Sequence, residues 1–452
     1  MKIRIIGGSH AGISTALRAR EEYPDSEIVI YEKQKTVGFI AQSIPLYLSG
    51  KRDFLQLSSY TTSQELSKKG IIVKTETVVR NISPNTKELT LISQIDDSVT
   101  TDTYDKLVLA TGSYPSLPLV KGDFHDKLFV IKDFEDAIKI KKLMETGSSV
   151  IVIGGGAVGT EVARIMNENG LKTTIVQSNE YILDKYLDRE VAAKIGETFR
   201  NNGIDIVTSS YVVDVRVKDA DDKNKKQIEV ITKDNKTFSA DGVIYATGFR
   251  PNSFLIADQV ELGDSGAIVV DDYMRTSIPD VFAVGDCATT TIMNVKTPIY
   301  VPHVSDAIRQ GEIAAINLVE EKRKIHASQG TYKLNFDQES TVCLTGLTKQ
   351  KATEEGFDCE SAFIRNDYLN SDKYFEMWLI YEKGSHKILG LQCRGNAPEI
   401  SAQADIMSLA IQQQMTVEDL EFVDFYFKHG YRNPKQFSEM LADAVRQQEQ
   451  TS

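Results

Sequence analysis

Two glycine-rich turns in the sequence have the residue spacing of a phosphate-binding loop. The second turn, GGGAVGTE at residues 154–161, follows an apolar segment and has the full set of glycines, Gly154, Gly156 and Gly159. The first turn, GGSHAG at residues 7–12, keeps the outer glycines but has Ser9 between them. Glycine lets the backbone approach a pyrophosphate closely, and the N-terminus of the following helix faces the anion. We therefore expect two nucleotide-binding turns in one chain.

The residues around each turn predict a strand, a helix and a second strand. The second strands are SEIVIYE (26–32) and LKTTIVQ (171–177). Glu32 ends the first, where a carboxylate can bind the two hydroxyls of a ribose, although an exposed charge at a strand end is the simpler interpretation. Gln177 ends the other. A carboxylate there would favour NAD and repel the 2′-phosphate of NADP, and a glutamine does neither strongly, so the nucleotide preference stays open.

Three further apolar segments end in short turns, YDKLVLATGSYP (104–115), DGVIYATGFRPN (241–252) and DVFAVGDCA (280–288). In the last of them Asp286 follows Gly285. Its carboxylate could accept a hydrogen bond from the ribitol of a flavin nucleotide, or it could cap the next helix.

The remaining sequence predicts helices and a different kind of sheet. A helix is expected over 304–320, and from about residue 330 the apolar residues alternate as in an antiparallel sheet. Two more helices are expected near 400–413 and 434–448, with a frayed tail at 446–452. The fold class is therefore α/β, with two Rossmann-like nucleotide-binding domains and an α+β C-terminal domain.

Composition narrows the function classes. The chain has 452 residues, enough for two to four domains, with 41% hydrophobic residues. Its net charge of −12 argues against general nucleic-acid binding. No apolar run reaches the roughly 18 residues of a membrane span, and no signal peptide is evident. The four cysteines form no CxxC pair, so we expect a reduced cytoplasmic protein without disulfides or a bound metal; they are Cys287, Cys343, Cys359 and Cys393.

With these motifs in place, the chain resembles the pyridine nucleotide–disulfide oxidoreductases, and within them the group of NADH oxidases, NADH peroxidases and coenzyme A disulfide reductases. The resemblance covers nearly the whole chain and also uses YEK (31–33), YVPHVSDAIRQG (300–311) and DFYFKHGYRNP (424–434). It implies FAD and NADH or NADPH as cofactor and substrate, and a homodimer in which the tail segment of one subunit lines the flavin site of the other. The implied domains are an FAD-binding domain at 1–112 and 245–325, an NAD(P)-binding domain at 113–244 and a dimerisation domain at 326–452.

The resemblance also implies the residues that contact the cofactors. Those expected to touch FAD are Gly7, Gly12, Glu32, Lys33, Val79, Thr111, Gly112, Lys132 and Asp286. Further expected cofactor contacts are Gly8, Ser9, Ala11, Ala110, Gly248, Gly285 and Val304. Those on the NAD(P) side are Gly154, Gly156, Val158, Gly159 and Gln177.

One segment departs from the group's pattern. In this group the segment usually follows a pattern similar to F-x-S-C-G-I-x-x-Y-x-G-G, and this chain has FIAQSIPLYLSG at residues 39–50. In that alignment, Gln42 stands at the position of the redox cysteine and Ser43 at the position of the next glycine. A glutamine cannot become a sulfenic acid or a mixed disulfide. No cysteine precedes Cys287, which we interpret as a small buried residue. Thiol-based peroxidase and disulfide chemistry are therefore not expected.

Four other positions bear on catalysis. His10 could transfer a proton to peroxide, or could simply pack in its turn. Glu161 lies near nicotinamide and flavin in the group, but a first-turn glutamate is also favoured by the helix dipole. Ala157 replaces a usual aromatic that covers the flavin, so the site could be open or could fail to handle nicotinamide. His429 could reach the partner's flavin, or be exposed to solvent.

These observations favour an FAD-dependent NADH oxidase that passes electrons to O2 and releases hydrogen peroxide without a cysteine redox centre. A reductase for a quinone or another small acceptor is an alternative. A non-catalytic FAD-binding sensor or structural relative is another, because Gln42, Ala157 and Gln177 all lie on the catalytic side. Coenzyme A binding through Arg18 is a weaker idea, since a solvated helix face also explains that arginine.

Overall fold

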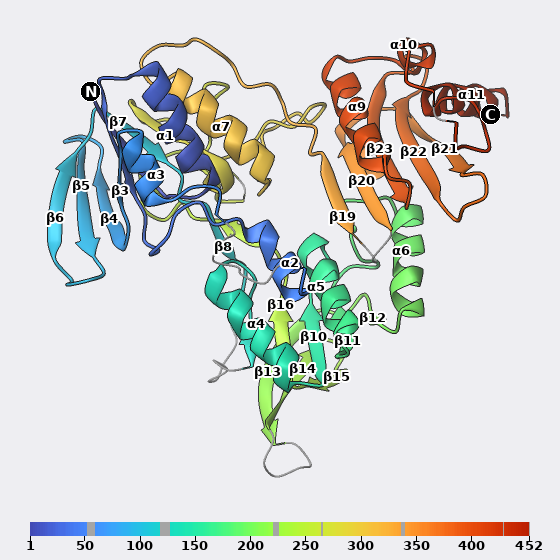
Figure 1. Ribbon diagram of the computed structural model, residues 1–452, viewed down its shortest axis with the longest axis horizontal. Coiled ribbons are helices and arrows are strands. Elements are labelled where there is room, and N and C mark those ends of the chain that lie inside the picture. Colours follow the sequence, from blue (N-terminus) through green and yellow to red (C-terminus); the bar gives the residue numbers. More distant parts are fainter. Residues whose placement is uncertain are drawn as a thin grey trace.

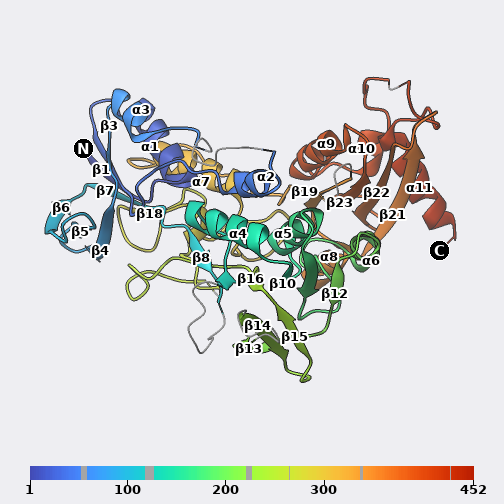
Figure 2. The ribbon, with the colours of Figure 1, turned by 60° about the horizontal axis from the view of Figure 1, so that its bottom comes forward.

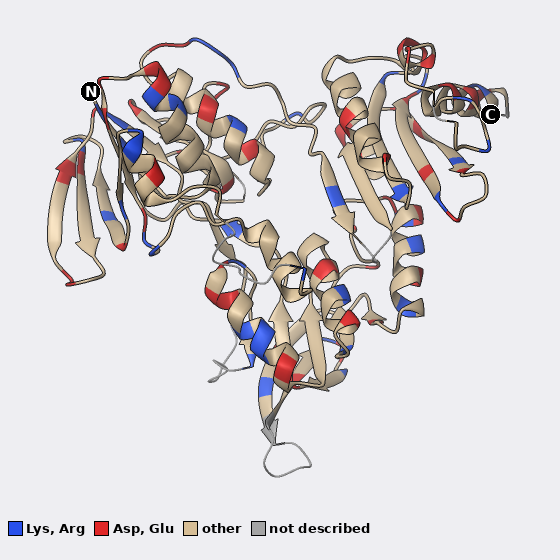
Figure 3. Ribbon diagram, viewed as in Figure 1, with Lys and Arg blue, Asp and Glu red and all other residues tan. Residues whose placement is uncertain are grey.

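Three packed units follow one another around a V-shaped arrangement, with the two chain ends on opposite arms (Figure 1). The computed structural model describes residues 1–51, 59–117, 127–219, 226–263, 265–335, 340–427 and 429–451. Acidic and basic residues are interspersed along all three units (Figure 3).

The first unit is a parallel sheet in the order β18-β7-β1-β2-β3. Its strands are β1 (Lys2–Ile6), β2 (Glu27–Tyr31), β3 (Ile71–Lys74), β7 (Lys106–Leu109) and β18 (Val281–Ala283). Helices α1 (His10–Glu22) and α7 (Val304–Ile316) lie side by side, and α3 (Ser63–Lys68) packs on β3. An antiparallel sheet of β4 (Thr77–Ser83), β5 (Glu88–Ser93) and β6 (Val99–Thr103) flanks this unit.

The second unit repeats the construction in the order β12-β11-β10-β16-β9. Its parallel strands are β9 (Leu128–Phe129), β10 (Ser149–Ile153), β11 (Lys172–Val176), β12 (Asp205–Val207) and β16 (Gly242–Tyr245). Its helices are α4 (Phe134–Thr146), α5 (Ala157–Glu168) and α6 (Arg189–Asn201), and a small sheet contains β13 (Val212–Asp219), β14 (Lys226–Thr232) and β15 (Thr237–Ala240). The strands β8 (Ser113–Pro115) and β17 (Phe249–Pro251) pair where the chain enters and leaves this unit. The first sheet is thus built from chain segments on both sides of the second.

The third unit is an antiparallel sheet in the order β19-β20-β23-β22-β21. Its strands are β19 (Tyr332–Asn335), β20 (Thr341–Gly346), β21 (Cys359–Asp367), β22 (Tyr374–Glu382) and β23 (Ile388–Gly395). Its helices are α8 (Lys349–Glu355), α9 (Ile400–Gln412), α10 (Val417–Glu421) and α11 (Phe437–Thr451). The antiparallel sheet and the helices after it agree with the sequence prediction.

Two predicted boundaries were wrong. The helix from residue 304 ends at Ile316, because the Asn317 side chain bonds the backbone around it, accepting from Lys322 N at 2.8 Å and donating to Ile313 O at 2.8 Å. The predicted frayed tail is instead helical as far as Thr451. Ion pairs hold this last helix to the unit, joining Arg446 to Glu421 and Glu449 to His386.

Among the described residues, no helix is long and apolar enough to cross a membrane, and no group of side chains has the composition of a metal site.

A buried arginine ties the flanking antiparallel sheet to the first parallel sheet. Arg4 of β1 is 2% exposed, and its Nε lies 2.6 Å from Asp102 Oδ2 on β6. Its guanidinium also pairs with Glu27, which is 52% exposed, against 19% for Asp102. Burial alone would raise the pKa of Asp102, but hydrogen bonds from Arg4 and Tyr31 outweigh it, so the pKa is lowered.

We predict that Asp102→Ala lowers the free energy of unfolding by about 2–3 kcal/mol, because it leaves a buried guanidinium without its main partner. The control Glu27→Ala should cost less than about 1 kcal/mol, since that carboxylate is half exposed. Urea unfolding followed by circular dichroism measures both. Because the folded pKa of Asp102 is depressed, its contribution is full above the unfolded value of about 3.9 and is lost as the pH falls through the folded value. Equal costs for the two variants would contradict this assignment.

Candidate active site

The first glycine turn is packed tightly against the end of the neighbouring strand. Gly7 has a φ of +113°, and a Cβ on it would lie 2.1 Å from the carbonyl oxygen of Ala110. Glu32, directly after β2, accepts a hydrogen bond from Gly8 N at 2.6 Å and is 9% exposed. The helix α1 that follows has Ser9 at its N-cap position, with no side-chain hydrogen bond to the helix. Its first N–H groups therefore have no side-chain cap, as an anion site requires.

The second turn has the same construction. A Cβ on Gly154 would lie 2.4 Å from the carbonyl oxygen of Ala246. Gln177, directly after β11, accepts from Gly155 N at 2.9 Å. The helix α5 starts after Gly156 without a side-chain cap, and a Cβ on Gly156 would meet nothing within 4 Å. In contrast, Asp133 caps α4 with hydrogen bonds to two backbone N–H groups. Both turns therefore fit a nucleotide pyrophosphate.

A polar cluster forms around Asp286, in the turn after β18. Ser113 Oγ donates to Asp286 Oδ2 at 2.7 Å, and Lys132 Nζ donates to Ser113 Oγ at 2.8 Å. Burial lowers the pKa of Lys132, and the charge of Asp286 opposes that shift. Gln310 of α7 fixes the turn by accepting from Gly285 N at 2.7 Å. This cluster of donors and acceptors fits the sugar alcohol of a flavin nucleotide.

His10 belongs to the same electrostatic environment. Its ring stacks on Tyr60, with centroids 5.5 Å apart and planes inclined by 13°. Burial lowers the pKa of His10, and the charge of Asp286 partly opposes this. Its Nε2 is buried without a hydrogen-bond partner among the described residues. The imidazole is therefore mainly neutral at pH 7, with one ring nitrogen available to a ligand.

The segment that departs from the family pattern forms a short 3₁₀ turn, Ala41–Ser43, followed by α2 (Ile44–Leu48). Gln42 is exposed on this turn, whereas Ser43 is buried and its Oγ donates to Ile40 O at 2.5 Å. The hydroxyl of Ser43 is thus tied to its local backbone, which leaves Gln42 as the accessible side chain of the pair.

The helix α2 lies against α4 and α5 (Figure 2). Its Ile44 and Leu48 are fully buried in the apolar core of the second unit, which also contains Ala157. Ala157 itself is 4% exposed.

All four cysteines are free and buried. Cys287 is completely buried, and its Sγ donates to Leu109 O and Val284 O, both at 3.3 Å, which confirms it as a small buried residue. Burial raises the pKa values of Cys287, Cys343 and Cys393. Thiols in such surroundings are poor nucleophiles, because the thiolate is the reactive form.

Glu161 lies at the junction of the three units. It is the fifth residue of α5, beyond the first turn, and burial raises its pKa while the charge of Arg164 opposes the shift. Its charge acts on Tyr332 of β19. The ring of Tyr332 lies 5.7 Å from that of Tyr186 and 5.5 Å from that of His303, just before α7. Glu161 is therefore half-buried on α5, which contacts β19, rather than on an exposed helix face.

Several predicted residues lie elsewhere or act differently. His429 is exposed in the third unit, close in sequence to the exposed Tyr426 and Phe427, while Lys428 lies outside the described residues. The side chain of Val79 is buried in the core of the first unit, so only its backbone could meet a cofactor. Arg18 pairs with Glu21 and Glu22 along α1, which supports the solvated helix face over coenzyme A binding.

Sequence reasoning missed Ser113, Tyr60, Tyr332, His303 and Gln310. Ser113, His303 and Gln310 stand inside quoted motifs, so their positions were a usable signal. Tyr60 and Tyr332 gave none, because their contacts join segments far apart in the chain.

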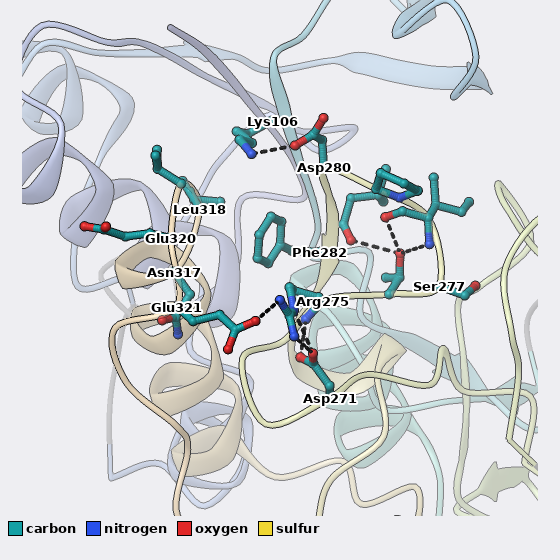
Figure 4. Close-up of a pocket in the computed structure, with 15 residues that line it drawn as sticks. Lys106, Asp271, Arg275, Ser277, Asp280, Phe282, Asn317, Leu318, Glu320 and Glu321 are labelled. Carbon is teal, nitrogen blue, oxygen red and sulfur yellow. Dashed lines mark hydrogen bonds and ion pairs between the residues drawn. The ribbon is translucent and has the colours of Figure 1, made fainter.

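A separate surface hollow of about 570 Å³ lies at the amino ends of β7 and β18 in the first sheet (Figure 4). Lys106 and Asp280 line it at the start of β7 and β18 and pair at 2.5 Å, and Arg275 pairs with Asp271. Nucleotides bind at the carboxyl ends of parallel strands, so this hollow at their amino ends does not belong to the site.

Comparisons with known proteins agree with this geometry. The sequence model of the pyridine nucleotide-disulphide oxidoreductases matches residues 1–311, and that of their dimerisation domain matches residues 339–427. An NADH oxidase of Enterococcus faecalis is 33% identical over 449 residues, covering 98% of this chain and 99% of the relative. A CoA-dependent NAD(P)H sulfur oxidoreductase of Pyrococcus abyssi is 27% identical over 432 residues, 94% of this chain and 93% of the relative.

Solved structures show the same fold along the whole chain. A water-forming NADH oxidase from Lactobacillus brevis, bound to NADH, superposes with a TM-score of 0.93 at 29% identity over 99% of this chain and 98% of that one. An NAD-dependent persulfide reductase from A. fulgidus superposes with a TM-score of 0.92 at 28% identity over 100% of this chain and 84% of that one. With two nucleotide turns and a flavin-compatible polar cluster in one chain, the protein belongs to the pyridine nucleotide-disulphide oxidoreductase family and is an FAD-dependent NAD(P)H oxidoreductase.

Proposed function

We propose that the protein is an NADH oxidase that releases hydrogen peroxide, by the reaction NADH + H⁺ + O2 → NAD⁺ + H2O2. The observation that carries the product assignment is Gln42, whose side chain is exposed. It stands where the resemblance to the family group would place a redox cysteine. All four cysteines of the chain are buried. A peroxide formed here meets no reactive thiol that could reduce it further, so it leaves. The similarity to NADH oxidases supports the oxidase assignment.

The two nucleotide turns divide the cofactors between the first two units. We assign FAD to residues 1–112 and 245–325, NADH to residues 113–244, and the subunit contact to residues 326–452. FAD, when bound, supplies the two-electron chemistry that joins NADH to O2. The protein contributes the placement of both nucleotides and the proton path.

The residues around Asp286 bind and orient the flavin nucleotide. The Lys132–Ser113–Asp286 chain is already formed, so its groups need little rearrangement to hold a sugar alcohol. His10 is mainly neutral, so it would first take up a proton from solvent at its free ring nitrogen and then pass a proton to reduced oxygen as the imidazolium. Glu161, with its raised pKa, lies where the α5 turn would hold nicotinamide and can orient its amide.

We also propose a homodimer whose contact includes the exposed aromatic residues of the third unit. Phe422 is 84% exposed, Tyr426 79% and Phe427 58%. Exposed aromatic side chains this close in sequence indicate a covered surface, and the segment overlaps the match to the dimerisation domain. His429, next to them, would then face the flavin site of the partner subunit.

The cysteines also bear on the compartment. All four are free, and the antiparallel pairing places Cys343 opposite Cys393 without joining them. Free cysteines are typical of a reducing compartment, so we assign the protein to the cytoplasm.

The oxidase assignment predicts that NADH bleaches the flavin band of the anaerobic FAD-loaded protein, and that about one hydrogen peroxide per NADH appears once air is admitted. A peroxide-specific assay against NADH consumption measures the ratio. Bleaching without oxygen consumption would favour a reductase for another acceptor. No bleaching by NADH or NADPH would favour a non-catalytic FAD protein.

The variant Gln42→Cys is the matched control for the product. It places a thiol at the position in question, where peroxide can oxidise it to a sulfenic acid and be reduced to water, and a second NADH, by way of the flavin, would return the sulfenic acid to the thiol. We expect less peroxide per NADH than in the parent protein, at a similar rate of flavin bleaching. An unchanged yield would mean that this position does not face the reduced oxygen.

For His10→Gln, we expect reoxidation of the reduced flavin by O2 to slow by about 100-fold, because the proton path is lost. Bleaching by NADH should change less than about threefold, since this step needs no proton from His10. Stopped-flow absorbance measures each half-reaction. Tyr60→Phe keeps the ring stack and loses only a hydroxyl, so it should resemble the parent. If His10→Gln leaves both rates unchanged, His10 only packs the turn.

A further inference from the structure

Gln177, directly after β11, occupies the position in the second unit that Glu32 occupies in the first. Glu32 follows β2 and accepts from Gly8 N, and Gln177 follows β11 and accepts from Gly155 N. Both side chains are buried, at 9% and 6% exposure. The two residues thus have one structural role, but only Glu32 carries a charge.

The equivalence continues through the next residues. Gly38 N donates to Gly8 O at 2.9 Å, and Leu183 N donates to Gly155 O at 2.8 Å. Both donors have left-handed backbones, with φ of +71° and +60°. A leucine adopts this conformation only where its surroundings enforce it, and Leu183 is completely buried. The segment 177–184 is therefore anchored firmly against the second glycine turn.

A carboxylate follows this anchor directly. Gln177 Nε2 donates to Asp184 Oδ1 at 3.0 Å, while Gln177 Oε1 stays on Gly155 N. Asn179 Nδ2 donates to Asp184 Oδ2 at 2.5 Å. The amide of Gln177 thus links the turn to a negative charge seven residues further along the chain. Asp184 is partly exposed, and each of its oxygens can accept another hydrogen bond.

The charged residues around Gln177 disfavour a phosphate group. Residues 177–184 contain Glu180 and Asp184 but no lysine or arginine. Arg189 is paired with Glu180, and the side chain of Lys185 is exposed. A 2′-phosphate beside Gln177 would meet the carboxylate of Asp184, and like charges close together oppose binding.

We propose that Asp184, held in place by Gln177, is the residue that selects NADH over NADPH. Its carboxylate accepts hydrogen bonds from the ribose hydroxyls, as Glu32 can in the first unit, and repels a 2′-phosphate. The proposal rests on the assignment of the second unit to the nicotinamide nucleotide. It answers the question that Gln177 alone leaves open.

The test uses ADP-ribose and 2′-phospho-ADP-ribose, which carry the adenosine end without nicotinamide. Calorimetry on the FAD-loaded protein gives both dissociation constants independently of turnover. We expect ADP-ribose to bind at least about 20-fold more tightly than its 2′-phosphate. Asp184→Asn should reduce that ratio by about 10-fold, mainly through tighter binding of the phosphate.

Two further variants separate this role from a general loss of charge. Asp184→Asn combined with Gln177→Glu puts an acid where Glu32 stands in the first unit, and we expect it to restore the preference for ADP-ribose. Asp205→Asn removes an exposed carboxylate at the amino end of β12, away from the turn, and should leave the ratio unchanged.

Equal binding of the two probes by the parent protein, no binding of either, or a ratio unchanged by Asp184→Asn would overturn the proposal. These outcomes are distinct from failure of the oxidase assignment. A protein that binds ADP-ribose selectively but gives no peroxide with NADH would keep the role of Asp184 and lose the oxidase. Peroxide formation with equal probe affinities would do the reverse.

Discussion

The hydrogen bond from a glycine-turn N–H to the side chain at the end of the next strand organises both nucleotide sites. It joins Gly8 to Glu32 in the first unit and Gly155 to Gln177 in the second. The bond draws the strand end toward the helix N-terminus, so that a phosphate group and a ribose group fall at fixed positions relative to each other. Around this shared construction the two units differ in one side chain, since the first has the acid Glu32 where the second has the amide Gln177.

The flavin-side cluster shows why the chain leaves the first unit and returns. His10 and Tyr60 precede the second unit, Ser113 stands at its entrance, and Asp286 follows it. Lys132 comes from the second unit itself. Inserting one nucleotide-binding unit into the other therefore closes a polar site between them. It also places α2 against α4 and α5, which fixes the turn that carries Gln42.

Much of this architecture follows from local sequence. Short apolar runs before glycine turns predict parallel strands, and the spacing of Gly154, Gly156 and Gly159 predicts a phosphate site without any knowledge of the fold. Asp286 was predicted from its motif and Lys132 from the family resemblance, and the structure brings them together. What local pattern cannot supply is a contact between distant segments. Tyr60 beside His10, Tyr332 beside His303 and the burial of Ala157 all depend on how the units meet. The helical C-terminus has the same origin, since its ion pairs come from residues 386 and 421.

The central proposal is that flavin is the only redox centre of the enzyme, because we place Gln42 at the position of the redox cysteine and all four cysteines are buried. An anaerobic reductive titration of the FAD-loaded protein tests this most directly. The account predicts that one two-electron equivalent of dithionite or NADH per flavin completes the bleaching, with no lag. Consumption of a second equivalent before the flavin is fully bleached would reveal another electron acceptor in the protein and would contradict the account.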